Sequence, residues 1–428
     1  MKTLVGDYTT ASGCTKAPIP PWALSGQPHR MNADTSTQPA FASSDGPARA
    51  VSAAGEHSPV RLVAPKTIQP WTGSPPAVRT RRDWLPRVDY LAAGGTIATL
   101  DDGHAAAGRP TLTAEAIARS VPAIGEVADL RTAQFMQRPS PSITFADLLA
   151  LRDEIALRIA DGSAGIVITQ GTDTIEETAF ALDLLCPRSA PVVVTGAMRS
   201  PSVPGPDGPA NLLAAVRVAA SAVARDLGVL VVFNDEIHAA RFVSKTHTSK
   251  PSAFQSRIIG PIGWLSEGHP VIVSRPVGRF CLNVPSDAHV PPVALIRVAL
   301  DDDGRILRSL AAHGFRGVVI EGFGGGHVTP PMVAAIEQLA SEMPVVLASR
   351  TGSGELLRST YRYRGSETEL LEIGAIPAGM LDGLKARVLL SLCLAANPAS
   401  EDVATAFQSV GMAAAPASAP AGDSLRTR

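Results

Sequence analysis

The stretch YLAAGGTIATL, residues 90–100, begins like a buried strand, breaks at Gly94 and Gly95, and then presents the hydroxyl of Thr96. Glycine allows a tight turn, and it also lets the backbone approach a substrate closely. In open α/β sheets, ligands bind beyond the carboxyl ends of the strands. The stretch therefore predicts a strand of an α/β sheet whose following loop is either a simple turn or part of a site.

Other short apolar runs repeat this arrangement along the chain. GIVIT (165–169), PVVVTG (191–196) and GVLVVF (228–233) are continuous and rich in β-branched residues. Such runs are typical of parallel strands that helices cover on both faces. Segments with apolar residues at helical spacing lie between them. Because the alternation resumes after a proline-rich stretch, we expect two α/β domains, of which the first is larger.

Composition indicates where these domains begin and end. Eleven of the 36 prolines fall in the first 80 residues, where large apolar residues are few, so we expect residues 1–83 to be disordered. The same reasoning applies to the tail, 413–428. The predicted domains are 84–272 and 292–412, joined by a linker at 273–291.

Charge and cysteine usage exclude several classes of protein. The chain has 428 residues and a formal net charge of −1, which gives no indication of a nucleic-acid or anionic-membrane partner. No apolar run reaches the roughly 18 residues of a membrane span, and we expect a cytoplasmic protein. The cysteines are scattered without C-x-x-C spacing, which argues against a disulfide scaffold and a zinc site. They are Cys14, Cys186, Cys281 and Cys393.

A second loop, TQGTDTIEET at 169–178, follows GIVIT. Thr174 and Glu177 fit a capping box that would start the next helix. That interpretation does not account for Thr172 and Asp173, which are placed at the same edge of the sheet as Thr96. A hydroxyl beside a carboxylate at a strand end can form part of a nucleophile–base set.

Two further loops follow the next strands. In 195–212 the sequence Asp-Gly-Pro at 207–209 predicts a turn, and we expect a structural role beside the site. In 234–250, Lys245 lies among serine and threonine residues. A single lysine is usually a solvated charge, but a lysine held near a threonine in a closed site can lose its proton and act as a base.

Together, the segments GGTIAT, GTDTIEETA, GAMRSP…DGPANL and RFVSKTHT resemble, in this order, the signatures of the bacterial-type L-asparaginase family. These amidohydrolases convert asparagine to aspartate and ammonia. The resemblance extends over about residues 87–410. It implies a larger N-terminal parallel-sheet α/β domain and a smaller C-terminal flavodoxin-like α/β domain. It also implies a small-molecule substrate, no metal or other cofactor, and a homo-oligomer, either a dimer or a tetramer.

The resemblance implies a role for each matching position in the catalytic motifs. Thr96 corresponds to the nucleophile that attacks the side-chain amide and forms an acyl-enzyme. Thr172 corresponds to the second catalytic threonine, and Lys245 to its lysine partner. Asp173 corresponds to the aspartate that binds the substrate α-amino group and belongs to the same relay.

The same comparison implies further substrate-binding positions. Ser140 corresponds to the serine that binds the α-carboxylate, with Ser142 as the alternative. Gly95 and Gly171 stand beside the two threonines, where backbone N–H groups can polarise the amide carbonyl. An acidic residue contributed by a neighbouring subunit falls on Glu367.

The sequence departs from the family pattern in two places. The family usually has a tyrosine, the activator of the first threonine, in the segment that follows the first motif, but residues 101–113 contain none. Tyr361 and Tyr363, close to Glu367 in the sequence, are candidates to replace it, although both can equally be packing residues. In addition, Gln170 stands where many members have histidine.

Other functions share some of these features. The chain could hydrolyse glutamine as well as asparagine, because the two substrates differ by one methylene, worth only about 1–3 kcal/mol of discrimination. The glutamine-hydrolysing subunit of a tRNA-dependent amidotransferase has related motifs. A non-catalytic amino-acid sensor on the same fold is a more distant alternative, since fold does not determine function.

Overall fold

The computed structural model describes residues 84–100, 111–186, 189–278, 280–396 and 400–411. The segments for which we predict disorder, 1–83 and 413–428, lie outside the described residues.

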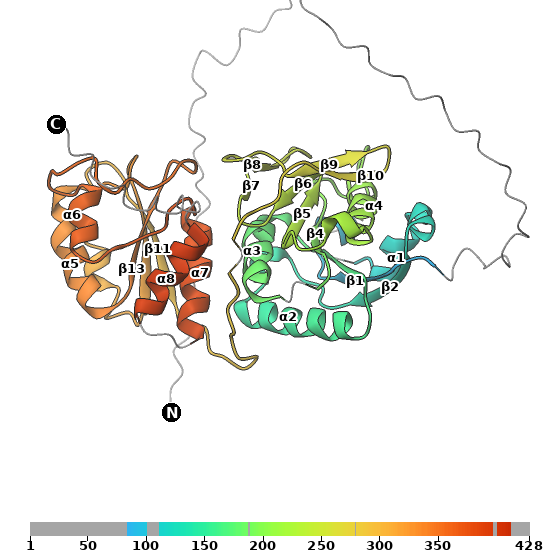
Figure 1. The fold of residues 1–428 in the computed structure, drawn as a ribbon, viewed down its shortest axis with the longest axis horizontal. Coiled ribbons are helices and arrows are strands. Elements are labelled where there is room, and N and C mark those ends of the chain that lie inside the picture. The colour runs from blue at the N-terminus through green and yellow to red at the C-terminus, as the bar shows by residue number, and fades with distance from the viewer. Residues whose placement is uncertain (1–83, 101–110, 187–188, 279, 397–399, 412–428) are drawn as a thin grey trace, which may run out of the picture. The chain divides into compact units, whose positions relative to one another are not determined.

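The first domain contains a mixed sheet of eight strands. They are β1 (Arg87–Ala92), β2 (Asp129–Gln134), β3 (Gly165–Thr169), β4 (Val192–Thr195), β5 (Val229–Phe233), β6 (Glu236–Ala239), β9 (Gly263–Ser266) and β10 (His269–Ile272). Their order across the sheet is β10-β9-β6-β5-β4-β3-β1-β2 (Figure 1). The helices of this domain are α1 (Ala114–Arg119), α2 (Phe145–Ala160), α3 (Ile175–Leu185) and α4 (Gly208–Ala219).

Strands β1, β3, β4 and β5 pair in parallel, as the continuous apolar runs predict, and β2 also pairs in parallel with β1. Three strands at the other edge, β6, β9 and β10, are antiparallel. The sequence analysis did not identify β2, β9 or β10. Most of their side chains are exposed or half-buried, so these strands, at or next to the edges of the sheet, lack the continuous apolar runs that mark the central ones.

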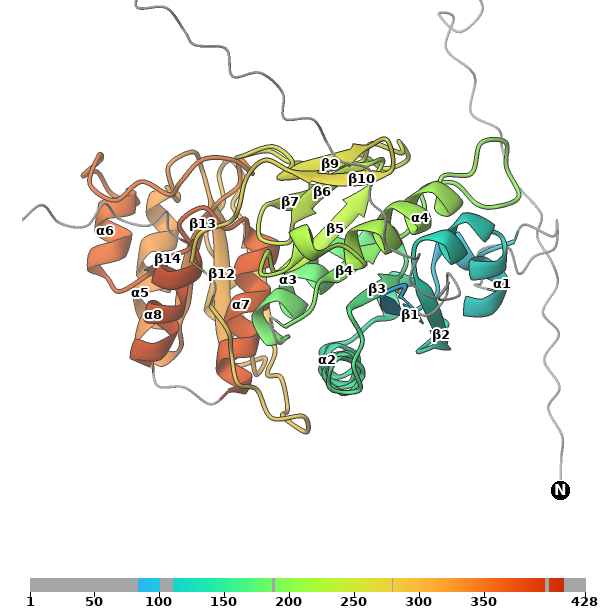
Figure 2. The same cartoon turned by 45° about the vertical axis from the view of Figure 1, so that its right-hand side comes forward.

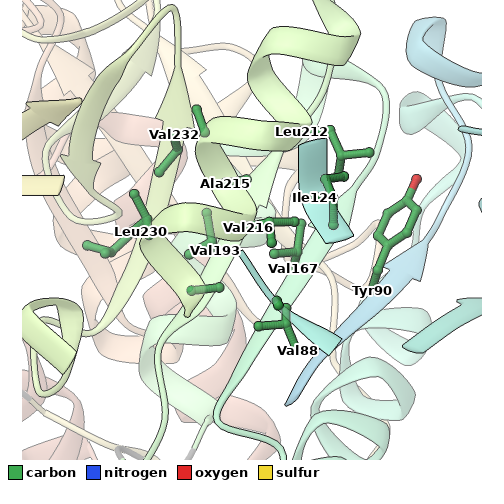
Figure 3. Close-up of a cluster of buried hydrophobic side chains, with 14 of the residues drawn as sticks. Val88, Tyr90, Ile124, Val167, Val193, Leu212, Ala215, Val216, Leu230 and Val232 are labelled. Atoms are coloured by element: carbon green, nitrogen blue, oxygen red, sulfur yellow. The ribbon is translucent and has the colours of Figure 1, made fainter. Parts of the chain in front are cut away.

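Helices bury both faces of the parallel part of the sheet. On one face, Val167 and Val193 pack with α1 and α4, and on the other, their neighbours Ile166 and Val192 pack with α2 and α3. Figure 3 shows the first of these clusters, in which Leu212 and the following turn of α4 lie over the strands. The prediction of a parallel arrangement covered on both faces is therefore confirmed for these strands.

The second domain is a smaller α/β unit. Its parallel sheet has the order β11-β12-β13-β14, formed by β11 (Val293–Arg297), β12 (Gly317–Gly322), β13 (Val345–Ser349) and β14 (Ile376–Pro377). Its helices are α5 (Val333–Glu342), α6 (Glu367–Glu372), α7 (Gly383–Ala395) and α8 (Ser400–Gly411). Helices α5 and α6 cover one face, and α7 and α8 cover the other (Figures 1 and 2). The two-domain α/β prediction is confirmed.

The helix starts show which local signals act as expected. Helix α2 begins with a capping box, in which Thr144 Oγ1 accepts from the Asp147 N–H and Asp147 Oδ2 accepts from the Thr144 N–H. The capping box predicted for Thr174 and Glu177 is wrong, because the Thr174 side chain makes no cap hydrogen bond. Residues Thr172–Thr174 instead form a 3-10 turn.

The two domains meet through α3 and α7. Apolar side chains of α3, including Phe180 and Leu184, belong to the same buried cluster as Leu389 and Leu392 of α7. A small two-stranded sheet of β7 (Val243–Lys245) and β8 (Phe254–Ser256) also contacts α3.

None of the helices in the described residues combines the length and the apolarity that a membrane span requires.

Gly165, at the start of β3, provides a test of how tightly α4 packs on the sheet. A Cβ at this position would lie 2.1 Å from the carbonyl oxygen of Ala219, which ends α4. We expect Gly165→Ala to lower the free energy of unfolding by about 1–3 kcal/mol, because the clash would push the end of α4 away from β3. Thermal or urea unfolding measures this change. Gly125→Ala is the matched control, since a Cβ there meets nothing within 4 Å; equal stability of the two variants would contradict the packing.

Candidate functional site

The parallel register brings the first two loops together. Ala92, the last residue of β1, pairs with Thr169, the last residue of β3. The residues that follow each strand therefore leave the sheet side by side. Gly95, with a φ of 87°, occupies the left-handed region, and a Cβ on it would lie 2.2 Å from the Gly171 nitrogen. The structure shows this glycine in close contact with the second loop; its predicted approach to a substrate stays a prediction.

A third segment lies against the same glycines. A Cβ on Gly171 would lie 2.7 Å from Ser140 Oγ, and that hydroxyl accepts a hydrogen bond from the Asp173 N–H at 3.2 Å. The carbonyl of Ser140 also accepts from Thr174 Oγ1. Three segments from distant parts of the sequence are therefore packed backbone to backbone, and each presents polar groups at the sheet edge.

Lys245 completes the arrangement from β7. Its Nζ donates to Thr172 Oγ1 at 2.8 Å and to Asp173 Oδ1 at 2.6 Å. The lysine side chain is 14% exposed, whereas that of Asp173 is 62% exposed. Lys245 is therefore not the solvated charge that a single lysine usually is, and the Asp173 carboxylate remains accessible from outside.

These groups line one cavity of about 330 Å³. Its lining residues are Gly95, Thr96, Thr99, Pro139, Ser140, Pro141, Gly171, Thr172, Asp173, Met198, Lys245 and Thr248. The predicted residues Thr96, Thr172, Asp173, Lys245 and Ser140 thus share a single space. Ser142 is exposed and does not line it, so the structure brings Ser140, and not its alternative, to the cavity.

The third loop lies beside the cavity, as expected, but the turn predicted at 207–209 is wrong, because Gly208 and Pro209 begin α4. Asp207 accepts hydrogen bonds from the N–H groups of Met198 and Arg199 at 3.0 and 2.8 Å. The amide of Asn211 bonds both Asp207 and the Gly196 carbonyl. Sequence analysis did not single out Met198 or Thr99 as lining residues. The signal that could have found them is their place in loops that follow strands of the parallel sheet.

Glu367 is not brought to this cavity within the chain. Its side chain is fully buried in the second domain, where Oε1 accepts from the N–H groups of Thr360 and Tyr361, each at 2.8 Å. Its Oε2 lies 3.2 Å from His327 Nε2. Burial by itself would raise the pKa of Glu367, but backbone N–H donors, together with the charge of His327, hold the pKa below its usual value. Both oxygens therefore already have partners.

The tyrosines near Glu367 form an aromatic cluster on the second domain. The rings of Tyr361 and Tyr363 contact the His327 ring edge-on, with centroids 5.0 and 5.4 Å apart. Tyr361 and Tyr363 are 44% and 50% exposed. Within the described residues, neither lines the cavity around Thr96.

Two other groups near the site have distinct environments. Gln170 is buried, and its Nε2 lies 3.3 Å from Thr174 Oγ1. Among the described residues, its Oε1 has no hydrogen-bond partner. Tyr90 beneath the first loop shares a hydrogen bond of 2.8 Å with Thr169, and burial raises the pKa of its phenol. In the described part of the chain, no cluster of three or more His, Cys, Asp or Glu side chains is placed to hold a metal ion.

Chemically, the cavity combines hydroxyls, a lysine and an open carboxylate. A hydroxyl can serve as a nucleophile when a base removes its proton. The amine of Lys245, held against Thr172, is placed to exchange a proton with that hydroxyl. The accessible carboxylate of Asp173 suits a cationic group on a ligand. These features fit acyl transfer on a small zwitterionic substrate.

Comparison with known proteins agrees with this chemistry. The chain matches the family "Asparaginase, N-terminal" over residues 87–277 and "Glutaminase/Asparaginase C-terminal domain" over residues 292–407. It is 35% identical over 318 residues to an L-asparaginase of Bacillus licheniformis, which covers 72% of this chain and 95% of that protein. It is 33% identical over 335 residues to a glutaminase-asparaginase of Pseudomonas fluorescens biotype A, with 76% and 90% covered.

Solved structures give the same result. The structure of the probable cytoplasmic L-asparaginase from Campylobacter jejuni is similar with a TM-score of 0.69 at 32% identity, over 76% of this chain and 99% of that one. The family matches cover both domains, and the relatives align over nearly their whole lengths. The chain therefore belongs to the asparaginase family.

Proposed function

We propose that this protein is an L-asparaginase, which hydrolyses the side-chain amide of L-asparagine to L-aspartate and ammonia. One observation carries the proposal: Lys245 Nζ contacts both Thr172 and Asp173 in the cavity that Thr96 also lines. The Bacillus licheniformis relative is an L-asparaginase, which supports the same activity here.

In the proposed reaction, Thr96 Oγ1 attacks the amide carbon. The hydroxyl proton is transferred to the departing nitrogen, and ammonia leaves as the Thr96 ester forms. Water then hydrolyses the ester, which releases aspartate and restores the hydroxyl. Thr172 and Lys245 are proposed to move the protons, because theirs is the hydroxyl–amine contact in the cavity. Backbone N–H groups at the glycine turn are proposed to stabilise the oxyanion.

Substrate recognition is assigned to the ends of the zwitterion. Asp173 would bind the α-ammonium, since its carboxylate is the accessible one. Ser140 would bind the α-carboxylate, as its hydroxyl lines the same cavity. Gly95 and Gly171 would keep the cavity floor free of side chains. Holding the substrate at both ends places its amide for attack without further binding groups.

Ammonia release from the purified chain tests the activity. We expect release with L-asparagine and none without an amide substrate. Comparison of kcat/KM for asparagine and glutamine then determines which substrate is preferred. The comparison is needed because the Pseudomonas fluorescens relative is named a glutaminase-asparaginase. Equal or greater efficiency with glutamine would make the chain a glutaminase-asparaginase. Release only with a partner protein would indicate an amidotransferase subunit, and amino-acid binding without turnover would indicate a sensor.

Replacement of Lys245 tests the proton-transfer role. We expect Lys245→Met to lower kcat by about 10²–10⁴, because methionine keeps an unbranched chain but cannot exchange a proton. Lys250→Met is the matched control, since Lys250 is an exposed lysine in the segment that follows β7. The control should keep kcat within about twofold of the parent, as surface substitutions usually have small effects. Parental turnover by Lys245→Met would refute the assignment.

We also propose a homo-oligomer, a dimer or tetramer, in which a neighbouring subunit contributes to the site. The family resemblance supports this arrangement, with Glu367 at the position of the contributed acid. Since the Glu367 carboxylate is engaged within its own domain, it would have to give up a partner to bind substrate. Analytical ultracentrifugation at micromolar protein is expected to show a dimer or larger species, and an active monomer would contradict the proposal.

A cytoplasmic location is proposed on similar grounds. The Campylobacter jejuni structure is titled a probable cytoplasmic L-asparaginase. A relative from Haemophilus influenzae, 32% identical over 324 residues, is named a probable periplasmic one. Both locations therefore occur among the relatives.

A further inference from the structure

A buried cluster of charges lies behind Lys245, at the contact between the two domains. Lys385, in the first turn of α7, has a side chain that is 1% exposed. Its Nζ donates to Asp382 Oδ2 at 2.8 Å and to Ser244 Oγ at 3.3 Å. It also lies 3.5 Å from Glu176 Oε2 on α3. The ammonium group thus contacts residues from both domains and from β7.

A fully buried ammonium needs compensation, because removing a charge from water costs several kcal/mol unless it is paired and hydrogen-bonded. Here two carboxylates and a hydroxyl surround it. Asp382 also caps α7 by accepting from the Lys385 N–H at 2.9 Å. Burial by itself would raise the pKa of Asp382, but the neighbouring ammonium outweighs it and lowers the pKa. The aspartate therefore remains a stable anionic partner for the lysine.

The cluster contacts two consecutive residues of β7, the side chain of Ser244 and the backbone of Lys245. Ser244 Oγ bonds Lys385 Nζ and donates to Asp382 Oδ2 at 3.3 Å. The backbone N–H of Lys245 donates to Glu176 Oε1 at 3.3 Å. The same Glu176 carboxylate thus contacts Lys385 through one oxygen and the Lys245 backbone through the other. From this anchored backbone, the Lys245 side chain extends to Thr172 and Asp173.

From these contacts we infer that Lys385 is a positioning residue for the reaction. By holding Ser244 and Glu176, it fixes the backbone of Lys245 so that Nζ meets Thr172 within hydrogen-bonding distance. The second domain thereby determines the geometry of proton transfer in the first. The inference rests on the proposed amidohydrolase function and assigns Lys385 no contact with substrate.

Small displacements in an active site are costly, since a shift of about 1 Å can reduce the rate about 10²-fold. We therefore expect Lys385→Met to lower kcat about 10- to 100-fold, with KM changed by less than about threefold, because the cavity-lining groups that bind substrate are retained. A role in stability alone predicts a lower melting temperature and parental kcat for the protein that remains folded.

Arg387→Met is the matched control on the same helix. Arg387 donates to the Val293 carbonyl at 3.0 Å and lies near the Phe145 ring, so its loss weakens packing of α7 without touching the cluster. We expect it to lower the melting temperature while kcat stays parental. Ser244→Ala is the second variant. It removes the hydroxyl between Lys385 and β7 but keeps the buried ion pairs, and we expect a roughly 3- to 10-fold loss of kcat near the parental melting temperature, about the effect of one hydrogen bond.

Hydrogen–deuterium exchange supplies a readout that does not depend on turnover. Peptides covering 243–247 should exchange faster in Lys385→Met than in the parent and in Arg387→Met, because Glu176, which accepts from the Lys245 N–H, loses the ammonium that holds it. If the parent fails to release ammonia, the proposed function is wrong, while this exchange still tests the anchoring.

Three outcomes overturn the inference. The first is unchanged exchange over 243–247 in Lys385→Met. The second is parental kcat in Lys385→Met or, should that variant not fold, in Ser244→Ala. Equal losses of kcat in Lys385→Met and Arg387→Met would also overturn it, because they would show a general effect of loosening α7.

Discussion

The contact between the backbones of Gly95 and Gly171 is the constraint on which the site depends. A Cβ on Gly95 would clash with the backbone of the second loop, so the loops that follow β1 and β3 can meet only if this residue has no side chain. The in-register pairing of β1 and β3 brings them to this contact. Thr96 and Thr172, each immediately after its glycine, therefore face one cavity although they come from different strands.

The lysine in this cavity depends on a different kind of interaction. Lys245 belongs to a short two-stranded sheet apart from the main one, and such a small sheet has little independent stability. Its position is set by apolar packing of Val243 and by the charge cluster around Lys385. Because buried charges must be matched by partners at defined distances, the cluster specifies one placement where apolar packing alone would tolerate several.

Within one chain, the second domain contacts the site through this cluster rather than through Glu367. In the chain as described, Glu367 supports the turn at residues 360–361 and the ring of His327. The aromatic pair above it, Tyr361 and Tyr363, stays largely exposed. An exposed aromatic surface can contact a neighbouring subunit, which is consistent with the proposed oligomer. Within one chain, these tyrosines do not line the cavity around Thr96.

The sequence by itself was sufficient to determine the central parallel strands, the two-domain α/β class and the loops that follow the strands, because these depend on short-range apolar patterns and glycine turns. It also pointed to Thr96 and Thr172 through their motifs. Through the family resemblance, the RFVSKTHT motif also made Lys245 the partner of Thr172. Only the tertiary structure decided the contact between them, across 73 residues of sequence, and that Lys385 lies behind both. It likewise decided that Thr174 does not cap α3. A lone charged residue carries no local pattern, so its partners are set by the packing of distant segments.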